Sequence, residues 1–410
     1  MEINRALGRD KYIELFGLSS VASPGRTVYQ NCYEELPFIT QPGFIKCLNA
    51  YIDDNKIDFL LPAHDNACLY LAKNRDQINC KVLISATDTC LICRSKTETY
   101  NFFSGHSFIP EVFKLEKISS VDLPLFAKPN IGQGSEGVAV LKTMSDLQRI
   151  IDTGVDYTIT ELLTGNEYTV DCFTDNEGNL LVASMRERTR AKSGIAVESK
   201  LIKTPQVVLD IATVINLCLK FTGVWFFQVK KNANGEYRLL EIAPRVAGTM
   251  GLSRIQGFNF VLNTINLALG KKIKVITNKI NDACVSRALT SRYILDYQFD
   301  TVYVDFDDTL IFKDKVNSEL LGLLYHFKNT GKKIILLSRH ETSLEEALRE
   351  YAIAPELFFK VHRLTQIERK SDYITSNKAI FIDDSFRERY DIHTNCAIPV
   401  FDVDAIEALW

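Results

Sequence analysis

Three carboxylates crowd the segment YVDFDDTL, residues 303–310. Asp305, Asp307 and Asp308 follow the apolar run 301–304, which predicts a buried strand. Carboxylates this close repel one another unless a divalent cation neutralises them. Parallel α/β sheets bind ligands at the carboxyl ends of their strands, so the segment predicts a cation site. A solvated acidic loop is the alternative.

Two further strand ends carry side chains suited to the same chemistry. The predicted strand 332–338 ends on Ser338, whose hydroxyl suits a phosphoryl oxygen, and the strand 379–382 precedes Asp383 and Asp384. Because the carboxyl ends of parallel strands meet at one edge, we expect these residues to lie near Asp305.

A cation for the phosphoryl group has three candidates, Lys360, Lys370 and Lys378. Lys378 precedes its strand, which places it about 13 Å below the carboxylates at the usual rise of a strand. Lys370 lies in the connection that enters this strand, and it is therefore favoured.

A second chemistry is indicated by FAKPNIGQGSEGVAVLK, residues 126–142. Lys128 stands at a strand end before a loop rich in glycine, whose backbone N–H groups can close over phosphates. An ordinary flexible hairpin is the alternative. The loop residues singled out for phosphate binding are Gly132, Gln133, Gly134, Ser135 and Gly137.

The segment 224–242 predicts a hairpin that turns on Asn234 and Gly235. With a two-residue turn there, Gln228 and Glu241 become direct cross-strand neighbours, with Cβ atoms roughly 5 Å apart. The pair predicts two metal ligands. A hydrogen-bonded pair on a half-exposed sheet is the alternative.

Basic residues alternate along the segment 185–194, as Arg186, Arg188, Arg190 and Lys192. In an extended strand all four point to one face. They predict either a solvated basic strand or a contact to an anionic substrate.

The elements that position these residues fall into three regions. Residues 1–95 alternate helices with apolar strands, which predicts a parallel α/β sheet. The chain opens on a helix there, so we expect the first strand, and the native N-terminus, to lie upstream. Residues 96–290 read as paired, hairpin-like strands, and residues 298–410 return to α/β alternation.

The composition sets limits on the partners. A net charge of −3 over 410 residues gives no electrostatic reason to expect nucleic acid or a membrane surface. No apolar run approaches the roughly 20 residues that span a bilayer, and no signal peptide is apparent. We expect a cytoplasmic protein.

Residues 298–410 resemble the haloacid dehalogenase-like phosphatase superfamily in the four motifs described above, taken in order. The resemblance implies a Rossmann-like domain in which Asp305 is the nucleophile and Asp307 the general acid and base, assisted by Ser338 and Lys370. It implies that Mg²⁺ is held by Asp305, Asp307, Asp383 and Asp384. The segment 311–332 leaves no room for a sizeable cap, so either the substrate is large or a neighbouring domain serves as the lid.

Residues 1–287 resemble the ATP-grasp superfamily, carbamoyl-phosphate synthase large-chain domains above all, with residues 1–95 matching the truncated domain that precedes this fold. The resemblance implies ATP and Mg²⁺ (or Mn²⁺) as cofactors. Lys128 and the glycine loop would bind the triphosphate, Gln228 and Glu241 the metal, and Arg245 the transferring phosphate. The implied remaining nucleotide contacts are Lys96, Glu161, Leu162, Leu163 and Glu167.

One residue departs from the family pattern. The motif Glu-x-Asn-x-Arg reads EIAPR here, so Ala243 stands where a second metal ligand is usual. Gln228 and Glu241 can still hold one ion completed by phosphate and water.

The sequence therefore predicts a bifunctional enzyme: an ATP-dependent carboxylate–amine ligase that forms an acyl-phosphate, fused to a phosphatase. The alternative is a phosphatase gated by a nucleotide-binding but inactive ATP-grasp half. Substrates are expected to be a small carboxylate, an amine and a phosphate ester, and related ligases often form homodimers. Similar fusions look like enzymes that tailor sugars or amino acids for surface polysaccharides.

Overall fold

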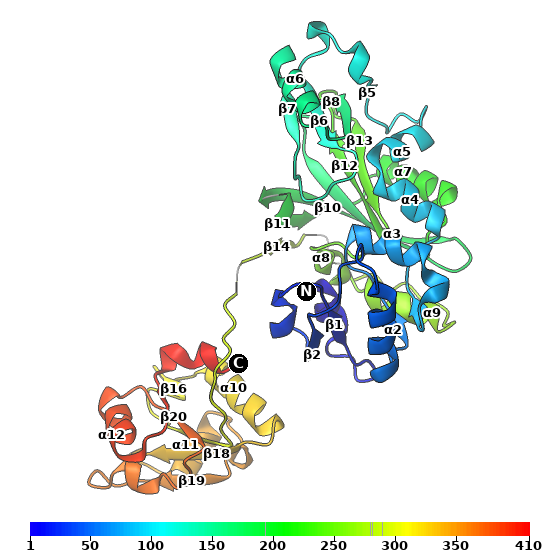
Figure 1. Ribbon diagram of the computed structural model, residues 1–410. Coiled ribbons are helices and arrows are strands. Elements are labelled where there is room, and N and C mark those ends of the chain that lie inside the picture. The colour runs from blue at the N-terminus through cyan, green and yellow to red at the C-terminus, as the bar shows by residue number, and fades with distance from the viewer. Residues whose placement is uncertain (193, 279, 281, 289) are drawn as a thin grey trace. The chain divides into compact units, whose positions relative to one another are not determined.

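The computed structural model describes residues 1–410 except 193, 279, 281 and 289, and it divides into two compact units. The first unit comprises Met1–Ala288 and the second Leu289–Trp410 (Figure 1). Each unit is described by itself below. The domain boundary expected at residue 95 falls inside the first unit and stays a prediction.

The first part of the first unit alternates helices with short strands. Its strands form two separate parallel pairs, β1 with β2 and β3 with β4, where one sheet was expected. Each strand spans only two or three residues, so the helices supply most of the buried surface. The elements are α1 (Glu2–Leu7), β1 (Phe16–Leu18), β2 (Asn31–Tyr33), α2 (Phe44–Asp54), β3 (Phe59–Leu60), α3 (Asp65–Lys73), β4 (Lys81–Val82), α4 (Thr87–Arg94) and α5 (Lys96–Phe102).

Two antiparallel sheets follow in the first unit. The smaller has the strand order β5-β8-β6-β7 and is covered by α6; the larger has the order β13-β12-β9-β10-β11-β14. The smaller contains β5 (Val112–Phe113), β6 (Leu125–Pro129), β7 (Ala139–Leu141), α6 (Met144–Asp152) and β8 (Tyr157–Glu161). The larger contains β9 (Glu167–Thr174), β10 (Leu180–Lys192), β11 (Ile195–Leu201), β12 (Gly223–Lys231), β13 (Tyr237–Ala243) and β14 (Cys284–Ser286).

Both faces of the larger sheet are buried, which explains the unbroken apolar run in β12. Trp225 and Phe227 pack in one cluster with α7 (Gln206–Cys218). Val224 and Phe226, which alternate with them, pack in another with α9 (Phe260–Ala268). The short helix α8 (Gly251–Arg254) precedes α9.

The turn between β12 and β13 differs from the sequence prediction. Asn232 N–H donates to Glu236 O over 2.9 Å, so the loop contains three residues, and the predicted two-residue turn is wrong. Gly235 has φ +80°, a left-handed conformation that glycine adopts without strain.

The predicted neighbours nevertheless face each other across this hairpin. Val229 pairs with Leu239, and the next pair is Gln228 with Glu241. Leu240 is thus an extra residue in β13, a bulge that shifts the register by one. The bulge offsets the longer turn, and Gln228 lies opposite Glu241.

The second unit has a five-stranded parallel sheet in the order β19-β18-β15-β20-β21. Buried residues form an apolar cluster on each face. The short hairpin β16–β17 lies between β15 and α10. The elements are β15 (Thr301–Val304), β16 (Ile311–Phe312), β17 (Lys315–Val316), α10 (Ser318–Asn329), β18 (Lys333–Ser338), α11 (Leu344–Glu350), β19 (Lys360–Arg363), β20 (Ala379–Ile382), α12 (Phe386–Cys396) and β21 (Val400–Phe401).

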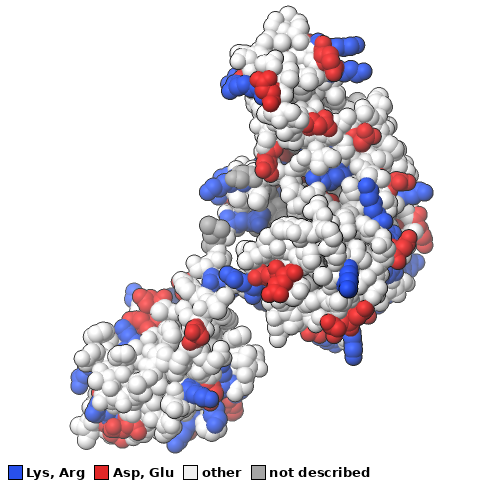
Figure 2. Space-filling model, viewed as in Figure 1, with Lys and Arg blue, Asp and Glu red and all other residues white. Residues whose placement is uncertain are grey.

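Charges of both signs are scattered over the face of the molecule shown in Figure 2. Among the described residues, no helix is long and apolar enough to cross a membrane.

Candidate active sites

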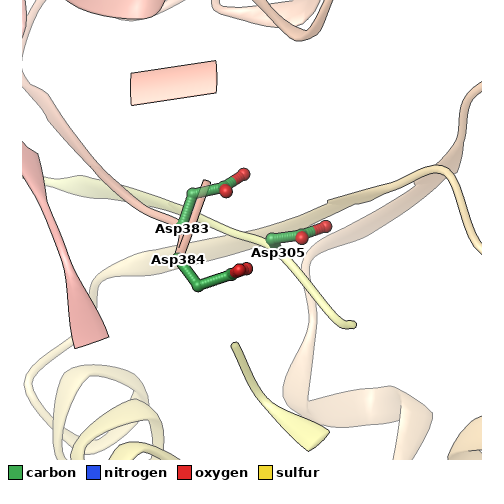
Figure 3. A group of neighbouring side chains, drawn as sticks. All are labelled: Asp305, Asp383 and Asp384. Carbon is green, nitrogen blue, oxygen red and sulfur yellow. The ribbon is translucent and has the colours of Figure 1, made fainter. Parts of the chain in front are cut away.

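Three carboxylates meet at the carboxyl edge of the parallel sheet in the second unit. Asp305 follows β15, Asp383 and Asp384 follow β20, and the two strands pair in register through Val304 and Ile382. One oxygen from each carboxylate lies within 4.8 Å of the others (Figure 3). Oxygen donors of this kind are those that Mg²⁺ prefers, so the donor set fits the predicted ion.

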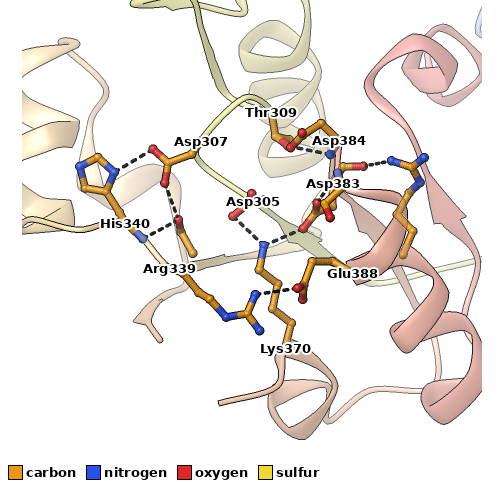
Figure 4. A network of polar contacts seen from close by, with 12 residues as sticks. Asp305, Asp307, Thr309, Arg339, His340, Lys370, Asp383, Asp384 and Glu388 are labelled. Atoms are coloured by element: carbon orange, nitrogen blue, oxygen red, sulfur yellow. Dashed lines mark hydrogen bonds and ion pairs between the residues drawn. The ribbon is translucent and has the colours of Figure 1, made fainter. Parts of the chain in front are cut away.

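Lys370 reaches the same cluster from a short 3-10 helix before β20. Its Nζ lies 2.6 Å from Asp383 Oδ2 and 2.8 Å from Asp305 Oδ1 (Figure 4). Asp305 is buried, and the ammonium of Lys370 is the charged group next to its Oδ1. Lys370 therefore holds the carboxylates of Asp305 and Asp383 side by side at this edge of the sheet.

Burial and neighbouring charges shift the pKa values of the residues in this cluster. Burial and the charge of Asp305 raise the pKa of Asp383 to about 7. Burial opposes the charged form of Lys370, but Asp305 and Asp383 together raise its pKa above the ordinary value. Lys370 thus stays positive and compensates the two carboxylates.

Asp307 points to a different group of side chains. Its Oδ1 lies 2.8 Å from His340 Nδ1, and its Oδ2 accepts from Ser338 Oγ over 3.2 Å (Figure 4). Asp307 lies outside the group of three carboxylates that share the cation site. The structure thus brings Asp305, Asp383, Asp384 and Lys370 together and places Asp307 beside Ser338.

Lys128 is the buried cation of the first unit. It is the last residue but one of β6 and has 5% of its surface exposed. Its Nζ contacts Tyr100 Oη and lies 3.5 Å from Leu240 O. Burial, and next the charge of Lys96, lower the pKa of Lys128 to about 7. The amine is poised to gain a proton when an anion arrives.

The glycine loop between β6 and β7 lies against other parts of the first unit. Lys96 Nζ donates to Gly132 O over 3.4 Å, and the side chains of Gln133 and His64 meet at 2.7 Å. A Cβ added to Gly194, between β10 and β11, would come within 2.1 Å of Gly134 C. The hairpin β10–β11 thus approaches the loop closely at Gly134, while residues 133–138 stay exposed.

The predicted metal pair lies beside an arginine. Arg188 Nη1 donates to Gln228 Oε1 over 3.2 Å and also pairs with Glu167. Arg188 Nε is buried and has no hydrogen-bond partner among the described residues. Glu241 offers a carboxylate that suits a hard cation, but the amide oxygen of Gln228 already accepts from the guanidinium of Arg188.

Comparisons with known proteins identify the fold of the first unit. A family profile described as "ATP-grasp in the biosynthetic pathway with Ter operon" matches residues 154–290. Structural matches cover about two thirds of the chain. The first unit has the ATP-grasp fold.

Three solved structures illustrate the likeness. An N5-carboxyaminoimidazole synthetase from Staphylococcus aureus complexed with ADP gives a TM-score of 0.57 at 13% identity, covering 70% of this chain and 79% of that one. An L-amino acid ligase from Bacillus licheniformis gives a TM-score of 0.53 at 17% identity, covering 65% of this chain and 70% of that one. A Rhizobium etli pyruvate carboxylase gives 0.56 at 15%, covering 68% of this chain but only 28% of its own. No curated protein sequence matches the chain.

Within the ATP-grasp fold, the predicted adenine segment connects the two antiparallel sheets. Glu161 ends β8 in the smaller sheet, Leu162 and Leu163 follow, and Glu167 opens β9 in the larger. Glu161 Oε1 accepts from Glu111 N–H over 3.1 Å.

Arg245 and Ala243 lie near the end of β13. The Arg245 guanidinium holds Asp65 in two contacts, of 2.6 and 2.7 Å. Although burial opposes ionisation, this contact keeps the pKa of Asp65 below its usual value. Ala243 and Glu241 line a small cavity that also exposes Asp65, Arg94 and Lys96.

The four alternating basic residues of β10 do not form a single basic face. Arg186 is buried and bonds to Asp171 over 2.8 and 3.0 Å, so it is neither solvated nor free for a substrate. Arg190 pairs with Glu198 on the surface. A register shift between Glu187 and Arg190 breaks the alternation, and only Arg188 faces the predicted metal pair.

Sequence reasoning missed three contacts of these sites: Asp65, His64 and His340. Asp65 and Arg245 are 180 residues apart, so no local pattern connects them. Asp65 is the first residue of α3 and His64 its N-cap, a few residues after β3, and His340 stands two residues after Ser338. Their position just past strand ends was the available signal.

Proposed function

We propose that the first unit is an ATP-dependent carboxylate–amine ligase. The observation that carries the proposal is the cross-strand pair Gln228 and Glu241 in an ATP-grasp fold, with Lys128 buried in β6 and its Nζ 3.5 Å from Leu240 O in β13. The proposed ligands are ATP and Mg²⁺ (or Mn²⁺), the latter held by Gln228 and Glu241. The bound ion supplies shielding of the phosphate charge.

The chain's own residues then position the reaction. Lys128, Lys96 and the backbone of residues 132–137 hold the triphosphate, and Arg245 steadies the transferring group. A substrate carboxylate oxygen attacks the γ-phosphorus, the bond to the β-phosphate oxygen breaks, and ADP leaves. The amine attacks the acyl carbon, phosphate departs, and the nitrogen loses a proton.

ADP release tests this proposal. The Asp305→Asn protein is incubated with Mg-ATP and pools of carboxylates and amines, including sugar acids and amino acids. We expect ADP only with particular pools, and none from the Asp305→Asn/Glu241→Ala double variant. Absence of ADP from every pool, with ATP demonstrably bound, would contradict a ligase.

We further propose that the second unit is a magnesium-dependent phosphatase of the haloacid dehalogenase-like type. The geometry that supports it is Lys370 between Asp305 and Asp383 at one sheet edge. Asp305 attacks phosphorus while Asp307 gives its proton to the departing alcohol oxygen. Asp307 then takes a proton from water, whose oxygen attacks the phosphorus and frees Asp305 and phosphate.

Single-turnover labelling tests the phosphatase. The wild-type protein is mixed with a ³²P-labelled ester and the reaction is stopped with acid, which preserves an aspartyl-phosphate. We expect the label on the peptide that contains Asp305. The Asp305→Asn variant is expected to carry none. Label at another residue, or hydrolysis without a labelled protein, would contradict the assignment.

Ala243 favours one alternative, a phosphatase gated by nucleotide. Alanine cannot ligate the second metal, and Arg188 already donates to Gln228. In that case ATP changes the rate of ester hydrolysis without release of ADP. The proposed substrates in either case are small metabolites, and a role in surface polysaccharide tailoring stays a prediction.

A further inference from the structure

The second unit contains a cavity of about 330 Å³ that the proposed chemistry does not use. Its wall is rich in guanidinium groups and extends along α12 to the last turn of that helix. The lining residues that matter here are Arg339, Arg369, Arg387, Glu388, Tyr390 and Asp391.

The cavity adjoins the carboxylate cluster through the chain itself. Arg339 directly follows Ser338, Arg369 directly precedes Lys370, and Arg387 lies in the first turn of α12, which begins just after Asp384. Figure 4 shows the pair of Arg339 and Glu388 beside Lys370. The same three segments therefore build the site and the cavity wall.

The cavity carries an excess of positive charge. Arg339 pairs with Glu388 at 2.8 Å, and Arg369 pairs with Asp391. Arg387 has no ion pair among the described residues of the second unit. Three guanidinium groups thus face two carboxylates.

One donor in the wall also lacks a partner. Arg339 Nε is buried without a hydrogen bond among the described residues, although Nη2 of the same side chain donates to Glu368 O over 2.6 Å. A buried unsatisfied donor is costly unless a ligand or water completes it. Guanidinium groups match the planar oxygens of carboxylate and phosphate.

We propose that this cavity binds a second anionic group of the substrate. The substrate class is a phosphate monoester whose alcohol part carries a further phosphate or carboxylate, and Arg387 is its principal contact. The volume lies in the range of small-molecule sites. The exposed ring of Tyr390, which also lines the cavity, offers an apolar contact to the carbon skeleton between the two anions.

The inference rests on the proposed phosphatase, and three probes with one carbon skeleton test it. Glucose 6-phosphate has a neutral alcohol part, 6-phosphogluconate adds a carboxylate, and glucose 1,6-bisphosphate adds a phosphate. With the full chain and Mg²⁺, we expect kcat/KM for at least one doubly anionic ester to exceed that for glucose 6-phosphate by about tenfold or more. The preferred ester shows which anion the cavity takes.

The variant Arg387→Gln is expected to abolish this preference through KM while leaving glucose 6-phosphate hydrolysis unchanged. Arg349→Gln is the matched control, because Arg349 is exposed on α11 and does not line the cavity. Equal hydrolysis of all three probes, unaffected by Arg387→Gln, would overturn the inference and leave the phosphatase standing.

A binding measurement separates the two proposals. The Asp305→Asn protein is titrated with 6-phosphogluconate and with glucose 1,6-bisphosphate, with and without Arg387→Gln. Binding that falls about tenfold with Arg387→Gln supports the anion site even if wild-type protein hydrolyses no ester, in which case only the phosphatase is wrong. Neither hydrolysis nor Arg387-dependent binding would overturn both.

Discussion

At the scale of single residues, the two units use buried lysines in opposite ways. Lys128 has no carboxylate within bonding distance among the residues that the structure describes, and burial lowers its pKa to about 7. Lys370 contacts two carboxylates, which raise its pKa although burial opposes this. The first lysine therefore suits a site that receives an anion, and the second suits a site that is already anionic.

Binding of ATP is expected to protonate Lys128. At pH 8 the free amine is mostly neutral, because its pKa lies near 7, and triphosphate stabilises the charged form. Calorimetry in buffers of different ionisation enthalpy should show uptake of close to one proton at pH 8 and little at pH 6. The Lys128→Met protein should show no such uptake, and equal uptake by both proteins would refute the assignment.

Lys370→Met is expected to destabilise the second unit. Removing one partner of a buried charge pair leaves Asp305 and Asp383 uncompensated and costs about 3 kcal/mol of unfolding free energy. Urea unfolding, monitored by hydrogen exchange in β15 and β20, measures the change in unfolding free energy. The double variant Lys370→Met/Asp383→Asn should recover part of it, and a double variant no more stable than the single one would count against charge imbalance.

At the scale of elements, the strands were predicted well and their connections less so. The apolar runs of β15, β18 and β20 correctly predicted the sheet edge at which Asp305 and Asp383 meet. A strand can be predicted in this way because its pattern of apolar residues is a property of the local sequence. The turn after β12 was mispredicted, yet Gln228 still faces Glu241 because the bulge at Leu240 offsets it. Bulges depend on packing from both faces, which the sequence of one hairpin does not specify.

The close contact between the hairpin β10–β11 and the glycine loop is a testable feature of the first unit. Gly194→Ala places a Cβ against the backbone of Gly134, so the loop must move. We expect ATP affinity to fall about tenfold. Gly154→Ala is the control, since Gly154 has a similar φ of +65° but open space around its Cβ.

Both glycine variants should share a small loss of stability from backbone strain, on the order of 1 kcal/mol. Only Gly194→Ala should change nucleotide binding, as measured by fluorescence titration with an ATP analogue. Equal affinities of the two variants for the analogue would show that the loop contact does not support the nucleotide site.

At the scale of the whole molecule, the hydrophobic clusters do not cross the division between the units. Each cluster of buried residues draws only on the first unit or only on the second. Two independent cores are expected to unfold as two cooperative transitions. The separation also explains why the motifs of the two proposed chemistries lie in two separate blocks of the sequence.

Independent folding can be tested by expressing residues 1–288 and 289–410 separately. We expect each fragment to unfold cooperatively within a few degrees of its transition in the full chain, in calorimetry and circular dichroism. If the proposed phosphatase is right, the second fragment should hydrolyse phosphate esters as well as the full chain does. A fragment that is unfolded on its own would show that the units stabilise each other.

The central claim for the whole chain is that its ligase reaction passes through an acyl-phosphate. Labelling with oxygen-18 tests this directly. The Asp305→Asn protein is incubated with Mg-ATP, amines and carboxylates labelled with ¹⁸O, and the released phosphate is analysed by mass spectrometry. Because the carboxylate oxygen attacks the γ-phosphorus and stays on it, we predict phosphate that carries one ¹⁸O atom. Unlabelled phosphate alongside ADP would mean simple ATP hydrolysis, and it would contradict the ligase.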